Sequence, residues 1–349
     1  MPVSIVVGGQ FGSEGKGKVA LEIVRRDATV AAVVRVGGTN SGHTAIGRDA
    51  KTYVLRQLPA AAADRSVQVV LPPGSFIDLP ILRRELKQLE IGPDRVAISP
   101  MARIISDQHK DWERASELGQ AIGSTQSGTG AAVLAMTARG AGNLPLTSTQ
   151  AEDVPELQPF LSDTTSLMRK LLNNGRRVLI EGTQGFGLSL LQGGYWPKAT
   201  SRDTSAAGFT AEAGLSPRDV DDVTMVIRCH PIRVAGESGH LTGETTWERI
   251  AADAGLPAGH QEFTTVTGRV RRVGHFDAEL VRRAIGTNHP DRIVLNHLDY
   301  VDWQVRSGAL TEKARSFVER VEDQIDHRVD WIGTSPADIR DRNWAAVCG

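Results

Sequence analysis

The chain has 349 residues, with 40 Lys and Arg against 41 Asp and Glu and a formal net charge of -1. This near-zero charge argues against a generic binder of nucleic acid, which needs a broad basic surface. The two cysteines, Cys229 and Cys348, exclude a disulfide framework or a four-thiolate zinc site within one chain and favour a reducing compartment. The N-terminal apolar run is too short for a signal peptide or a membrane span, so we expect a cytoplasmic protein.

Short β-branched runs alternate along the chain with segments whose apolar residues have helical spacing. The predicted strands are residues 4–7, 30–36, 67–71, 178–180, 225–227 and 293–295, and the predicted helices are residues 79–89, 163–172, 277–285 and 312–325. This alternation predicts an α/β fold with a mainly parallel central sheet and helices on both faces. Gly- and Pro-rich stretches at 72–80, 140–157 and 255–262 are predicted loops, and none is a clear linker. We therefore expect residues 1–349 to form a single elaborated domain.

A glycine-rich loop at residues 8–18 follows the first strand and precedes a helical pattern at 19–24. Free backbone N–H groups and the positive end of a helix dipole meet in such a loop, which suits phosphate. Gly12, Gly17 and Lys18 fit the first part of a P-loop pattern, but Val19 stands where the magnesium-binding Ser or Thr should be. The spacing also fails the dinucleotide pattern G-x-G-x-x-G. The alternative is a tight strand-to-helix turn with solvated lysines.

Two further glycine clusters, at residues 37–44 and 181–187, follow later strands. Loops after successive parallel strands open at the same edge of a sheet, so we expect these clusters to meet the first. His43 could then donate a proton or a hydrogen bond to a phosphate oxygen, although a loop histidine is commonly structural or merely exposed. The other histidines lack zinc-ligand spacing.

A fourth element, residues 264–274, combines hydroxyls, glycines and three arginines. If it is extended, Arg269 and Arg271 lie on the same side, where guanidinium groups match carboxylates. A solvated basic loop is the alternative. Asp299 ends the last predicted strand, where it could accept hydrogen bonds from a base edge or cap a helix.

In this order, the motifs resemble those of the adenylosuccinate synthetase family. Residues 8–18 are similar to G-x-Q-W-G-D-E-G-K-G-K, 40–44 to N-A-G-H-T, 181–185 to E-G-A-Q-G, 266–272 to T-T-G-R-x-R-R and 297–299 to K-L-D, with further matches at 122–125, 138–140 and 196–201. The resemblance spans nearly the whole chain. It implies the family's P-loop-NTPase-like α/β fold, Mg²⁺ as cofactor and a homodimer, with no nucleic acid or membrane partner.

The resemblance also implies roles for individual residues. The catalytic groups would be Ser13, Lys16, His43 and Gln184. The triphosphate would be held by Gly12, Ser13, Glu14, Gly15, Lys16, Gly17, Lys18, Gly42, His43, Thr44, His297, Asp299, Gly333 and Ser335. The purine monophosphate would be held by Ser13, Asn40, Thr125, Gln184, Thr200 and, from the second subunit, Arg139. L-Aspartate would be held by Thr267, Gly268, Arg269 and Arg271, and magnesium by Ser13 and the carbonyl of Gly42.

Three positions depart from the family pattern. Ser13 stands where the family has its catalytic Asp, and a serine hydroxyl is not a useful base at neutral pH without an activating partner. It is shorter than a carboxylate and uncharged, which leaves room and a hydrogen-bonding atom for a 2-amino group on the purine. This change resembles the phage-encoded branch of the family, which makes N6-succino-2-amino-2'-deoxyadenylate from dGMP and L-aspartate for 2-aminoadenine DNA. His297 replaces the family's Lys, and Ser335 stands where the family reads T-G-P, so ATP or dATP joins GTP as a candidate donor.

The resemblance thus implies a two-step ligation in the cytoplasm, that of the host if the chain is phage-encoded. The γ-phosphate is transferred to O6 of dGMP, and the amino group of L-aspartate then displaces phosphate at C6. A substrate carboxylate or a bound water would take the N1 proton. The first alternative is an ordinary adenylosuccinate synthetase acting on IMP with GTP, and the second is a non-catalytic nucleotide-binding regulator.

Overall fold

The computed structural model describes residues 2–64, 66–264 and 268–342. Its centre is a nine-stranded sheet in the order β16-β15-β14-β10-β1-β9-β2-β5-β7, in which neighbouring strands are parallel except β15 and β16. The strands are β1 (Val3–Gly8), β2 (Val30–Arg35), β5 (Gln68–Leu71), β7 (Val96–Ile98), β9 (Arg177–Glu181), β10 (Val220–Arg228), β14 (Arg292–Asn296), β15 (Trp331–Ser335) and β16 (Asp338–Asp341). The predicted α/β class and each predicted strand are confirmed.

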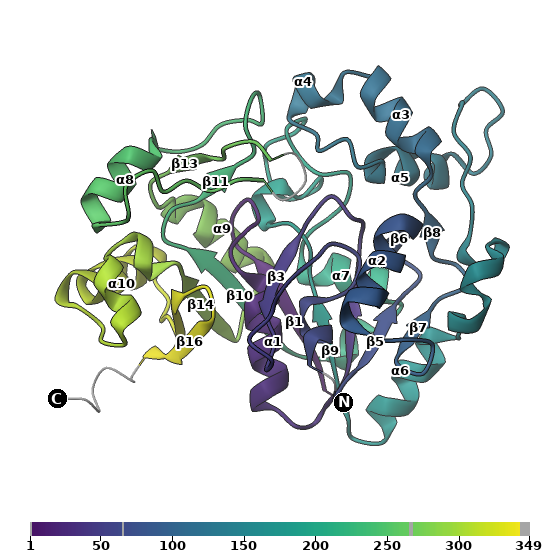
Figure 1. The fold of residues 1–349 in the computed structure, drawn as a ribbon, viewed down its shortest axis with the longest axis horizontal. Coiled ribbons are helices and arrows are strands. Elements are labelled where there is room, and N and C mark those ends of the chain that lie inside the picture. Colours follow the sequence, from purple (N-terminus) through teal and green to yellow (C-terminus); the bar gives the residue numbers. More distant parts are fainter. Residues whose placement is uncertain (1, 65, 265–267, 343–349) are drawn as a thin grey trace.

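Helices cover both faces of this sheet (Figure 1). One face packs against α1 (Lys16–Arg26) and α2 (Leu79–Leu89). The other packs against α6 (Thr164–Asn173), α7 (Ala206–Ala213), α9 (Ala278–Asn288) and α10 (Glu312–Ile325). In β1, Ile5 and Val7 belong to one core cluster and Val6 to the other, because successive side chains point to opposite faces. Burial on both faces explains why these strands are continuous apolar runs.

Side-chain caps set the starts of the predicted helices. Asp163 and Asp277 accept hydrogen bonds from Ser166 N and Leu280 N, so each is a cap and its helix begins one residue later than predicted. The predicted bounds of α2 and α10 agree with the structure. Among the described residues, no helix combines the length and the apolar character that crossing a bilayer requires.

Smaller elements stand above the carboxyl ends of the central strands (Figure 1). One group is α3 (Asp107–Ala115), α4 (Leu118–Ile122) and α5 (Thr129–Ala138). The other is the sheet of β11 (Ile232–Arg233), β13 (Arg272–Gly274) and β12 (Glu244–Thr245), with α8 (Trp247–Ala254) beside it. The described fold also has short 3-10 helices and two short strand pairs, β3 (His43–Ile46) with β4 (Thr52–Leu55) and β6 (Phe76–Ile77) with β8 (Arg103–Ile104).

Candidate functional site

The three glycine clusters meet at the carboxyl edge of the sheet, as predicted. A Cβ added to Gly185 would lie 2.6 Å from Gly12 N, so the third cluster touches the first. A Cβ added to Gly17 would lie 2.8 Å from the Cβ of His43, so the second cluster touches the first as well. Glycine is needed at these contacts because any side chain would separate the loops.

The first loop is built around a buried ion pair. Glu14 accepts hydrogen bonds from Gly12 N at 2.7 Å and from Lys16 Nζ at 2.6 Å, and both side chains are almost fully buried. Gly12 and Gly15 have φ of +91° and +92°, and α1 begins directly after Gly15 with no side-chain cap. The N–H groups at the start of α1 are thus not capped by a side chain, which suits an anion.

Lys18 points to the other side of this loop. Its Nζ donates to the carbonyls of Ser335 at 2.9 Å and Asp338 at 3.2 Å. Burial lowers the pKa of Lys18 to about 8, against the opposing charges of Asp299 and Asp338. The alternative of a turn with solvated lysines is therefore wrong for both Lys16 and Lys18.

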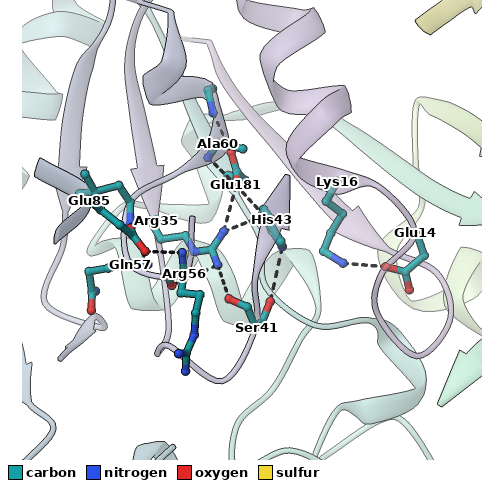
Figure 2. A network of polar contacts seen from close by, with 12 residues as sticks. Glu14, Lys16, Arg35, Ser41, His43, Arg56, Gln57, Ala60, Glu85 and Glu181 are labelled. Atoms are coloured by element: carbon teal, nitrogen blue, oxygen red, sulfur yellow. Dashed lines mark hydrogen bonds and ion pairs between the residues drawn. The ribbon is translucent and has the colours of Figure 1, made fainter. Parts of the chain in front are cut away.

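His43 is buried beside two charged residues, Arg35 and Glu181 (Figure 2). Its Nδ1 lies 2.5 Å from Glu181 Oε1, and Arg35 Nη1 lies 2.9 Å from the same oxygen. Burial, followed by the charge of Arg35, lowers the pKa of His43 to about 4, so the imidazole is neutral at pH 7. Burial opposes ionisation of Glu181, but the contacts with His43 and Arg35 bring its pKa down to about 2.

A cavity of about 470 Å³ opens beside the first and second loops. Its volume falls within the range of small-molecule sites. It brings together eight of the residues assigned to substrates: Gly12, Ser13, Asn40, Gly42, Thr125, Gln184, Thr200 and Arg271. Residues of α3, α4 and α5 form one wall, including Trp112, Leu118 and Leu134.

Ser13 is held at the edge of this cavity by two arginines. Arg271 donates a hydrogen bond to Ser13 Oγ, and Arg228 Nη1 donates to the Ser13 carbonyl at 3.0 Å. Ser13 has a φ of 57°, in the left-handed region. Arg228 is fully buried and pairs with Glu262 at 2.6 Å. Sequence reasoning missed Arg228 and Glu262, although a charged residue that ends an apolar strand such as β10 is a usable signal.

We expect Glu262→Gln to destabilise the fold by about 3–5 kcal/mol at pH 7, because it leaves the buried Arg228 without its counter-charge. Burial would raise the pKa of Glu262, but Arg228 lowers it to about 2. Because the folded-state pKa is depressed, the pair stabilises above the unfolded pKa of roughly 4.3, and the effect is lost as pH falls towards about 2. Urea unfolding of wild type and variant should give a smaller difference at pH 3 than at pH 7.

The matched control for that measurement is Glu312→Gln, which removes a carboxylate that is 86% exposed from a surface pair with Arg315. It should change stability by less than about 1 kcal/mol. If Glu262→Gln loses no more stability than Glu312→Gln, the stabilising role of the Arg228–Glu262 pair is contradicted. A loss of stability that is as large at pH 3 as at pH 7 contradicts it as well.

The arginine-rich element is only partly in the cavity. Arg271 lines it, whereas Arg269 is exposed and is absent from the lining. Phe263 and Val270 form an isolated antiparallel bridge, so these two residues do not lie on one continuous extended strand. The structure therefore does not bring the two guanidinium groups together in the cavity. Gly268 is exposed, and Thr267 lies outside the described residues.

The residues assigned to the triphosphate base gather near Lys18. A Cβ on Gly333 would lie 2.7 Å from Lys18 Nζ, and Ser335 follows on the same strand. Asp299 lies within a short 3-10 helix that begins after His297, so the alternative of Asp299 as a helix cap is wrong. Burial raises the pKa of Asp299. Burial and then the charge of Arg228 lower the pKa of His297 well below its ordinary value, so the imidazole is neutral.

Arg139 lies away from the cavity. It ends α5 in the left-handed conformation, is exposed and does not line the cavity of its own chain. Its role in a neighbouring subunit stays a prediction.

The proposed magnesium ligands offer only neutral oxygens. Within the described ranges, no group of three or more His, Cys, Asp or Glu side chains could hold a metal ion. Ser13 Oγ already accepts a hydrogen bond from Arg271, so the Gly42 carbonyl oxygen is the better available of the two candidate ligands. Since Mg²⁺ commonly keeps waters and takes ligands from substrate phosphates, this donor set fits a metal that arrives with a triphosphate.

Comparisons with known proteins match the chain to one family. The family model described as adenylosuccinate synthetase matches residues 5–145 and 144–307. The chain is 36% identical over 345 residues to adenylosuccinate synthetase of Methanococcus aeolicus, covering 96% of this chain and 97% of that protein. It is 36% identical over 341 residues to the enzyme of Methanocaldococcus jannaschii, covering 95% and 94%.

Two solved structures are similar over nearly their whole length. One is succinoaminodeoxyadenylate synthetase of cyanophage S-2L, bound to dGMP and to dATP as an energy donor, with 30% identity, a TM-score of 0.79 and coverage of 99% of this chain and 96% of that one. The other is fully ligated adenylosuccinate synthetase of Plasmodium falciparum, with 20% identity, a TM-score of 0.84 and coverage of 97% and 99%. At 20% identity, the second shows a shared fold.

Proposed function

The chain belongs to the adenylosuccinate synthetase family of carbon–nitrogen ligases, which join aspartate to a purine nucleotide, and we propose that its purine substrate is dGMP. The observation that carries the proposal is Ser13 at the wall of the purine cavity. A hydroxyl there accepts a hydrogen bond from a 2-amino group, whereas the space left by the shorter side chain accommodates that group. The product would be N6-succino-2-amino-2'-deoxyadenylate.

Overall similarity favours a second candidate, the ordinary reaction of IMP with L-aspartate and GTP. The archaeal relatives are adenylosuccinate synthetases and are 36% identical to the chain, against 30% for the phage enzyme. The third candidate is a nucleotide-binding regulator without turnover. Asn40, Gln184 and Arg271 remain at the cavity, which supports a working site over a silent one.

The arrangement supports a mechanism that depends on positioning and charge. Asn40, Thr125, Gln184 and Thr200 would hold the purine monophosphate in the cavity. The loop at residues 12–18 would bind the triphosphate with its backbone N–H groups, and His43 would stabilise the transferring phosphoryl group. Arg271 would bind a carboxylate of L-aspartate, and the family resemblance assigns Thr267, Gly268 and Arg269 to the same substrate.

The missing base is the main chemical difference from the family mechanism. Ser13 orients the purine through its hydroxyl, and a carboxylate of the bound L-aspartate or a water takes the N1 proton. The Gly42 carbonyl together with phosphate oxygens would hold magnesium, which would supply charge neutralisation when bound. The Ser13 hydroxyl oxygen has no lone pair left for the metal while it accepts from Arg271 and from the purine amino group.

The phosphoryl donor is proposed to be ATP or dATP, with GTP as the alternative. A neutral His297 lacks the charge of the family's Lys, which weakens recognition of guanine next to Asp299. Gly333 and Ser335 line the same region through their contacts with Lys18. The phage relative bound to dATP as an energy donor is consistent with this choice.

Release of phosphate with each purine monophosphate, with and without L-aspartate, tests these candidates together. We expect aspartate-dependent release with dGMP and a kcat/KM for IMP at least about 10-fold lower, since a site built to pair a substrate amino group discriminates against its absence. A preference for IMP overturns the dGMP assignment and supports the ordinary synthetase. Nucleotide binding without aspartate-dependent release with either monophosphate identifies the regulator.

A further inference from the structure

Glu181, the last residue of β9, has contacts that the mechanism above does not use. It is fully buried, and its Oε1 accepts hydrogen bonds from Arg35 Nη1 and from Ala60 N, each at 2.9 Å. Its Oε2 accepts from Ala61 N at 3.3 Å. His43 Nδ1 is the remaining neighbour, at 2.5 Å from Oε1 (Figure 2). The carboxylate therefore joins the end of β9 to side-chain and backbone groups that lie 120 to 146 residues earlier in the chain.

These contacts determine which nitrogen of His43 carries the proton. An ionised carboxylate only accepts hydrogen bonds, so a contact of 2.5 Å between Glu181 and Nδ1 requires a proton on Nδ1. Arg35 Nη1 also lies 2.6 Å from Nδ1, but its hydrogen bond goes to Glu181 Oε1, because a protonated Nδ1 has no lone pair to offer. Nε2 is left facing away from the cluster, 3.5 Å from Ser41 Oγ.

The same cluster fixes the backbone that carries the ring. Arg35 Nη2 donates to the carbonyl of Ser41 at 2.9 Å, which anchors the loop directly before His43. On the opposite side, His43 packs against Gly17 at the start of α1, where a Cβ would lie 2.8 Å from the Cβ of His43. Lys16 is the next charged group on that side and is paired with Glu14. The ring thus has one orientation, with Nε2 on the side away from Glu181, where it can accept a hydrogen bond from the Ser41 hydroxyl at 3.5 Å.

We propose that Glu181 is a positioning residue for His43, which fixes the Nδ1–H tautomer and presents Nε2 to the transferring phosphoryl group. The arrangement follows the logic of a catalytic group oriented by a third residue that does not touch the substrate. This inference rests on the role proposed for His43, and it applies equally to dGMP or IMP as the substrate.

The tautomer can be observed without turnover. In a long-range ¹H–¹⁵N spectrum of protein labelled at its nine histidines, the His43 signals are identified by their loss in His43→Asn. We expect the pattern of a neutral ring protonated at Nδ1 in wild type and an exchanging or reversed tautomer in Glu181→Gln. A wild-type ring protonated at Nε2 overturns the proposal, whatever the substrate.

A double-mutant cycle tests the functional link. Glu181→Gln keeps the shape of the side chain but introduces an amide donor where every neighbour already donates. We expect it to lower kcat about 10–100-fold, with KM for the monophosphate and for L-aspartate changed by less than about 3-fold. In the His43→Asn background, Glu181→Gln should cause little further loss, because it acts through the ring that has already been removed. If the loss of kcat in the double variant equals the product of the losses in Glu181→Gln and His43→Asn, the proposal is overturned.

Glu85 provides the matched control from the same region. It is equally buried and accepts hydrogen bonds from the backbone N–H groups of Arg56, Gln57 and Leu58, but has no hydrogen bond to His43. Glu85→Gln should lower stability, leave kcat within about 3-fold and combine multiplicatively with His43→Asn. Glu181→Gln leaves the buried Arg35 without its counter-charge and could therefore fail to fold. In that case the double variant Arg35→Gln/Glu181→Gln, which removes both charges, takes its place in the cycle. The spectrum of the wild-type protein decides the tautomer of His43 in either case.

Discussion

Ser13→Asp is expected to lower kcat/KM for dGMP by about 100-fold and to raise that for IMP. In the structure, Arg271 donates to Ser13 Oγ at the wall of the cavity. A carboxylate at this position would form an ion pair with Arg271 and extend into the space that the 2-amino group needs. It would also restore the base that takes the N1 proton of IMP. Steady-state kinetics with the two monophosphates measure the switch.

Ser13→Ala is the matched control, since it removes the hydroxyl without adding charge or volume. Its kcat/KM should fall roughly 10-fold for dGMP and should not rise for IMP, because removing the hydroxyl removes a hydrogen bond but supplies no base. Both variants must fold, and the left-handed φ of 57° at this position costs Ala about 1 kcal/mol more than Asp, which tolerates it. Unchanged dGMP kinetics in Ser13→Asp would contradict the role given to Ser13.

The fold was predictable because its signals are local. Residues 30–36 and 178–180 are short apolar runs rich in β-branched residues, a pattern typical of buried strands, and the glycine clusters after them mark the carboxyl edge of the sheet. Parallel strands then bring those loops together without further information. The single-domain assignment remains a prediction.

Contacts between side chains that are far apart in the sequence could not be predicted from the sequence pattern. Arg35 meets Glu181 across 146 residues, and Arg271 reaches Ser13 across 258. The residues around one partner do not predict the other, because the order of the strands in the sheet determines which side chains come into contact. The motif at residues 8–18 likewise gave no sign that Lys16 and Lys18 point to different partners. The pairing of charges, rather than their presence, is what the three-dimensional structure adds.

Arg139→Ala is expected to reduce kcat/KM for the purine monophosphate by about 10–100-fold, as the loss of a charge-assisted contact to phosphate would. We propose that this arginine serves the partner subunit of a homodimer. It is exposed, ends α5 and is absent from the cavity lining of its own chain, and Met136 on the same helix is an exposed apolar residue that does not line the cavity either. Arg84→Ala, at an exposed arginine on α2, is the control and should leave kcat/KM unchanged.

Mixing two inactive variants then tests whether sites are shared. Arg271→Ala removes a cavity residue but keeps Arg139, so a mixed dimer with Arg139→Ala rebuilds one complete site from the intact parts of both subunits. In a two-fold dimer with random exchange, half of the dimers are mixed and each has one working site, so equal mixing should restore roughly a quarter of wild-type activity. If Arg139 acted within its own chain, every site in the mixture would lack one residue and activity would stay at the level of the single variants. Recovery that depends on subunit exchange is therefore the result that a shared site requires.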